Sequence, residues 1–80
     1  MNKIVVYTSI YGSKDTLKDP LFYNKEFDYI CFTDNKNLKS NIWKIVYKAP
    51  THKDPVRSAK IFKIKPHEFL KEYDISLWID

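Results

Sequence analysis

Glycine and cysteine are almost absent from this 80-residue chain, which has one residue of each. A single glycine, Gly12, excludes the glycine-rich loops that bind dinucleotides and nucleoside triphosphates, and also the nucleophile elbow, because each motif needs at least two glycines. A single cysteine, Cys31, excludes an internal disulfide framework and a zinc site built from cysteines. We therefore expect an intracellular, cytoplasmic protein.

Long apolar runs and a strong excess of one charge are also absent. No run approaches the ~18 residues of a membrane-spanning helix, and the first apolar stretch is too short for a secretory signal. Fourteen basic and ten acidic residues give a formal charge of +4, with the lysines scattered along the chain. This mild excess favours anionic partners such as nucleotides, or serves only solubility. Without a clustered basic stripe, nucleic-acid binding is the weakest hypothesis.

Four segments rich in β-branched and aromatic residues predict strands in a single small domain over residues 1–80. They are Lys3–Tyr11, Asp28–Asp34, Asn41–Lys48 and Asp74–Asp80. The first, second and fourth are nearly continuous in apolar residues, which is typical of buried strands. The third alternates between apolar and polar positions, which is typical of a strand with two unlike faces.

A helix is predicted to begin at Asp54 and Pro55, because aspartate caps free amides and proline suits the first helical position. It runs to about Lys65, and a short second helix is expected over His67–Tyr73. The order predicts an α/β, Rossmann-like fold with a mostly parallel sheet of about four strands and one or two helices. One or two helices are too few to cover both faces of a parallel sheet. We therefore expect either an incomplete domain or a homo-oligomer.

Polar residues at the ends of the predicted strands are the first candidates for a binding site. Open α/β sheets bind ligands at the carboxyl ends of their strands. These ends carry Thr8 and Ser9 with Gly12, then Asp34, then Asp80. A carboxylate there suits a ribose, a base or a divalent metal. Asp34, followed by an asparagine, is equally typical of a turn.

The predicted helix carries Arg57, Lys60 and Lys63 at successive spacings of three, which places them on one side of the helix. Arginine and lysine bind phosphate well, so Arg57 and Lys60 are candidate phosphate ligands. The alternative is that these long side chains lie along the surface with their charges in water.

These segments resemble a glycosyltransferase-like family formerly catalogued as domain of unknown function 616, which includes the plant mucilage-related glycosyltransferase-like proteins. The resemblance covers almost the whole chain and is carried by Ile4–Gly12, Asp28–Asn35, Trp43–Val46, Asp54–Lys60, Pro66-His67 and Ser76–Asp80. It implies a nucleotide-sugar-binding fold of the GT-A type. It also implies that only the N-terminal donor half is present, because family members continue past the final aspartate with an acceptor-binding half.

Carried over by position, the resemblance implies a role for six residues. Thr8, Ser9 and Asp34 would face the nucleoside, Arg57 and Lys60 the ribose or diphosphate, and Asp80 a divalent cation such as Mn²⁺ or Mg²⁺. The implied function is that of a glycosyltransferase that binds a nucleotide-diphospho-sugar such as a UDP-sugar, with no catalytic residue assigned. The alternative is a non-enzymatic α/β domain that acts through oligomerisation or protein binding.

Overall fold

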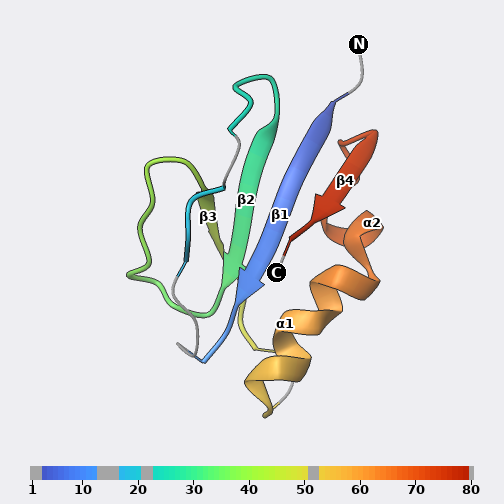
Figure 1. The fold of residues 1–80 in the computed structure, drawn as a ribbon. Helices are drawn as coiled ribbons and strands as arrows, with labels where there is room; N and C mark the ends of the chain where they lie inside the picture. Colours follow the sequence, from blue (N-terminus) through green and yellow to red (C-terminus); the bar gives the residue numbers. More distant parts are fainter. Residues whose placement is uncertain (1–2, 13–16, 21–22, 51–52, 80) are drawn as a thin grey trace.

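The chain folds into an α/β structure with a four-stranded, all-parallel sheet (Figure 1). The computed structural model describes residues 3–12, 17–20, 23–50 and 53–79. In chain order the elements are β1 (Ile4–Ile10), β2 (Asp28–Thr33), β3 (Lys44–Tyr47), α1 (Pro55–Ile64), α2 (Pro66–Phe69) and β4 (Ile75–Trp78). The predicted α/β fold and the four predicted strands are confirmed.

The sheet has the strand order β3-β2-β1-β4, so β1 and β2 are central and β3 and β4 form the edges. Alignment of β1 with β2 runs from Val5 opposite Asp28 to Ile10 opposite Thr33. On the other side of β1, Ile4 lies opposite Ile75. The chain crosses from β3 to β4 through α1 and α2, because two parallel strands of one sheet need such a crossover connection.

One face of the sheet packs against α1 and α2 through aromatic side chains. Phe62 of α1 is 2% exposed and stacks on Phe32 of β2 with 4.3 Å between ring centroids and 7° between ring planes. Its ring also contacts Phe69 of α2 at 4.7 Å. Val5 and Tyr7 of β1 complete this core from alternate positions of the strand, as a period of two requires.

The other face is covered by irregular segments of the chain rather than by a helix among the described residues. Val6, Tyr29, Cys31 and Trp43 form a second buried cluster there. The indole Nε1–H of Trp43 donates to the carbonyl of Lys18 at 2.9 Å, which ties the segment before β2 to the segment before β3. In Figure 1, residues 17–20 and the segment before β3 lie on the β3 side of the sheet. In the described part of the chain, this second core is therefore completed by loop residues.

The predicted third strand was too long at its amino end. It was expected from Asn41, but β3 begins at Lys44. Ser40 Oγ accepts hydrogen bonds from the backbone N–H groups of Ile42 and Trp43, at 3.1 and 3.0 Å. These side-chain bonds take the place of sheet pairing and form a turn. The second helix was also predicted too long, since α2 ends at Phe69 and not at Tyr73.

The prediction that the fourth strand is buried was wrong. β4 is an edge strand, and Ile75, Leu77 and Ile79 are 40%, 45% and 37% exposed. Trp78, whose side chain points to the opposite face of the strand from these three, packs edge-on against Tyr7 with ring centroids 5.4 Å apart. The strand is therefore anchored by one face only. None of the described helices has the length and apolar character needed to cross a membrane.

Candidate functional site

The carboxyl ends of β1 and β2 and the amino end of α1 lie at the same end of the molecule (Figure 1). Gly12 lies shortly after β1 and Asp34 directly after β2, so both are at the strand ends where the sequence placed them. The helix begins at Pro55, and the carbonyl of Asp54 accepts the first intrahelical hydrogen bond, from Ser58 at 3.1 Å. Asp54 thus occupies the predicted N-cap position.

Asp34 and Gly12 are joined directly at this edge. The N–H of Gly12 donates to both carboxylate oxygens of Asp34, at 3.2 and 3.3 Å. Gly12 has a φ of 72°, in the left-handed region that glycine adopts without a steric penalty. A bend at Asp34 is fixed further by Thr33, whose Oγ1 accepts the N–H of Asn35 at 3.1 Å. Asp34 therefore serves as a turn residue and also presents a carboxylate at the edge.

Thr8 and Ser9 lie within β1, which continues to Ile10. As neighbours in a strand they point to opposite faces of the sheet. Thr8 is buried, and Ser9 Oγ donates to the carbonyl of Ala59 in α1 at 2.8 Å. This hydrogen bond between the sheet and the helix fixes the position of α1 relative to β1.

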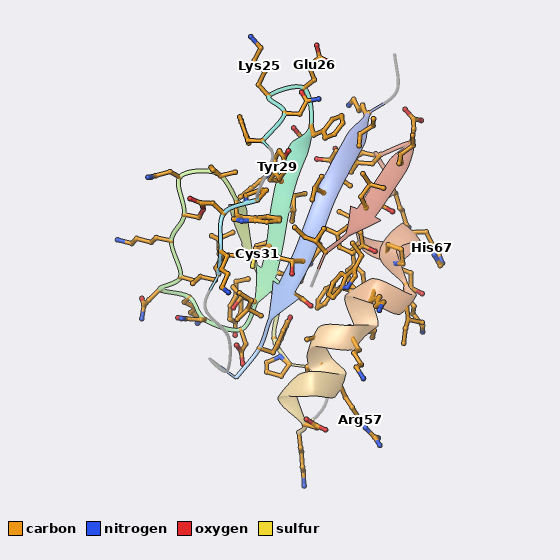
Figure 2. All side chains as sticks on the ribbon, in the orientation of Figure 1. Lys25, Glu26, Tyr29, Cys31, Arg57 and His67 are labelled. Carbon is orange, nitrogen blue, oxygen red and sulfur yellow. The ribbon has the colours of Figure 1, made fainter. Side chains whose placement is uncertain are left out.

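Arg57 and Lys60 are exposed on α1. Arg57 lies in the first turn of the helix and extends away from the sheet (Figure 2). Ser58 and Phe62, which are buried, mark the side of the helix that packs on the sheet. Both cations therefore lie on the solvent side of α1.

Tyr11 is a residue of this edge that the sequence reasoning did not single out. Its hydroxyl donates to the carbonyl of Lys48 at 2.9 Å, which joins the end of β1 to the segment after β3. Its ring stacks on Phe62 at 5.8 Å. Burial raises the pKa of Tyr11 to about 12, and the negative charge of Asp34 adds to the effect. The sequence signal that could have identified Tyr11 is its position as the aromatic residue that ends a predicted strand, directly before the only glycine of the sequence.

The predicted metal ligand, Asp80, lies outside the described residues. Within the described part of the chain, no group of three or more histidine, cysteine, aspartate or glutamate side chains is arranged to hold a metal. The edge does offer the carboxylate oxygens of Asp34, which are ligands of the type that Mg²⁺ and Mn²⁺ prefer. The described residues can accept hydrogen bonds from hydroxyls at Asp34 and attract anions at Arg57 and Lys60.

Family models, curated proteins and solved structures give no match to this chain.

Proposed function

We propose that the chain is the nucleotide-sugar-binding, donor half of a glycosyltransferase that works in the cytoplasm. One observation carries the proposal: the carboxyl ends of β1 and β2, with Gly12 and Asp34, share one end of the molecule with the amino end of α1, which bears Arg57. Ligands of open α/β sheets bind at such an edge. The sequence resemblance to the glycosyltransferase-like family supports a donor-binding site at this same edge of the sheet.

In this proposal each described residue has a specific role. Asp34 keeps acceptor capacity beyond its bond to Gly12, since an ionised carboxylate has about four lone-pair sites, and it accepts from the ribose or the base. Arg57 and Lys60 neutralise the diphosphate from the helix side. Thr8 and Ser9 act as supports, because Thr8 is buried and Ser9 holds α1 in place.

In this proposal, Asp80 and the oxygen atoms of the diphosphate would hold a divalent cation. When bound, Mn²⁺ or Mg²⁺ supplies positive charge that stabilises the diphosphate as a leaving group. The chain's own contribution is to orient the donor, with Asp34 at its nucleoside end and Arg57 and Lys60 beside its phosphates.

Calorimetric titration of UDP and UDP-sugars, with and without Mn²⁺, tests the proposal. We expect binding that is strengthened by the metal and weakened about tenfold or more by Arg57→Ala, because hydrogen bonds to charged groups contribute roughly 1.5–3 kcal/mol. Lys71→Ala is the matched control, since Lys71 is exposed and follows α2, away from the carboxyl edge.

The opposite outcome is equally specific. A folded chain that binds no UDP-sugar at millimolar concentration contradicts the proposal. If that chain also self-associates in sedimentation experiments, the non-enzymatic alternative is favoured. Its expected contact is the exposed Ile75 and Leu77 of edge strand β4, with Ile79 directly after the strand.

A further inference from the structure

A cavity of about 360 Å³ lies at the amino ends of β2 and β3, at the opposite end of the strands from the proposed donor site. It results from the unequal starts of the two strands. β2 begins at Asp28, whereas β3 begins at Lys44, which lies opposite Ile30. The first two residues of β2 therefore extend past β3, and the space beside them is the cavity.

Apolar and aromatic side chains form one wall of this cavity. Tyr23 stacks on Tyr29, with 5.1 Å between ring centroids and 29° between ring planes, yet Tyr23 is 57% exposed, so much of its ring is open to a ligand. Asn24 holds the segment in place, because its N–H donates to the hydroxyl oxygen of Tyr29 at 2.9 Å. Phe27 and Ile42, which are partly buried, continue the wall.

Charged groups of both signs line the same cavity. The hydroxyl of Tyr73 donates to Oδ2 of Asp28 at 2.6 Å, which orients this exposed carboxylate. Burial and the contact with Asp28 raise the pKa of Tyr73, so the phenol keeps its proton and remains a donor. Lys44, the first residue of β3, brings an ammonium group. Lys25 also lines the cavity, but Figure 2 shows its side chain extending away from the sheet.

We propose that this cavity binds a free aromatic amino acid in its zwitterionic form. The ammonium group of the ligand binds Asp28, its carboxylate binds Lys44, and its ring packs on Tyr23 and Phe27. A simple anion would be repelled by Asp28 and a simple cation by Lys44, whereas a zwitterion matches both charges. The volume lies near the lower end of the roughly 300–1,000 Å³ typical of small-molecule sites, which suits one amino acid.

A titration of the whole chain with L-phenylalanine and L-tryptophan tests the proposal. Binding is monitored by the NMR chemical shifts of Tyr23 and Lys44. We expect saturable binding that is about tenfold or more weaker for N-acetyl-L-phenylalanine, which lacks the positive charge, and for phenethylamine, which lacks the carboxylate. No saturable binding of either amino acid at millimolar concentration overturns the proposal. Binding of N-acetyl-L-phenylalanine and phenethylamine that is as tight as binding of L-phenylalanine also overturns it, and so does tighter binding of glucose.

Two variants locate the interaction. Asp28→Asn and Lys44→Met each remove one charge from the cavity and are expected to weaken L-phenylalanine binding about tenfold. Lys44 is exposed, so its variant decides the question if Asp28→Asn loosens the contact with Tyr73. Lys39→Met, an exposed lysine outside the cavity, is the matched control. Arg57→Ala leaves amino-acid binding unchanged, which separates this site from the proposed donor site.

Discussion

Polar side chains near the carboxyl edge connect elements that are distant in the sequence. Ser9 links β1 to α1, Tyr11 links β1 to Lys48, and Asp34 links the ends of β2 and β1. Each bond closes a gap of more than 20 residues, so each helps to fix the edge as a rigid frame. Residues selected as candidate ligand contacts are thus also structural contacts, and a substitution there changes both affinity and stability.

Gly12 is the residue whose conformation limits substitution most. With φ at 72°, an alanine there would place its Cβ close to the backbone, and we expect Gly12→Ala to destabilise the fold by about 1–2 kcal/mol. Gly12→Asn should be milder, because asparagine tolerates the left-handed region better than other residues. Urea unfolding of the two variants measures the difference. Equal stability of Gly12→Ala and the natural chain would contradict the reason given.

At the scale of elements, α1 is held firmly and β4 loosely. Phe62 of α1 contacts three other rings, those of Tyr11, Phe32 and Phe69. β4 contacts the sheet through one neighbouring strand, β1, and exposes the aliphatic side chains of Ile75 and Leu77. The crossover helix α1 therefore contributes to the hydrophobic core, whereas the edge strand β4 is largely exposed to solvent.

Truncation of one side chain in each element tests this contrast. Phe62→Ala removes a buried ring and should lower the free energy of unfolding by about 3–5 kcal/mol. Leu77→Ala shortens a side chain that is 45% exposed and should lower it by less than about 1 kcal/mol. Chemical denaturation monitored by tryptophan fluorescence gives both values. A loss at Leu77 as large as that at Phe62 would mean that β4 is covered in solution.

The whole molecule has two small cores on either side of one sheet, and both contain ionisable groups that are neutral when buried. Cys31 is fully buried, and burial raises the pKa of its thiol from the ordinary value of 9.0 to about 11. Tyr11, on the other side, has its pKa raised from 10.0 to about 12. Both groups release their protons more readily in the unfolded chain than in the folded one.

Stability should consequently fall in alkaline solution. The contribution of Cys31 is complete below pH 9 and is lost as the pH rises to about 11, because the unfolded chain then binds fewer protons than the folded chain. Tyr11 extends the decline towards pH 12. Urea unfolding at a series of pH values measures the slope, and Cys31→Ala should flatten it between pH 9 and pH 11. An unchanged slope in that variant would contradict the assignment to Cys31.

Much of the fold followed from local patterns in the sequence. The strands predicted at Lys3–Tyr11 and Asp28–Asp34 are observed at Ile4–Ile10 and Asp28–Thr33, and the helix begins at the predicted Pro55. The late start of β3 was not predictable, because it depends on hydrogen bonds that the backbone N–H groups of Ile42 and Trp43 donate to Ser40, in competition with sheet pairing. Apolar composition did not reveal that β4 is an exposed edge, because a run such as Leu77 to Ile79 looks the same in either position.

The sequence by itself determined the strand and helix types, the parallel α/β class and the polar residues near the strand ends, because these depend on the order and periodicity of neighbouring residues. Only the tertiary structure decided which of those residues meet. It joined Asp34 to Gly12, placed Ser9 against the carbonyl of Ala59 in α1 and brought Tyr73 to Asp28 across 45 positions of chain. Such contacts depend on strand order and register, which packing of the whole chain selects.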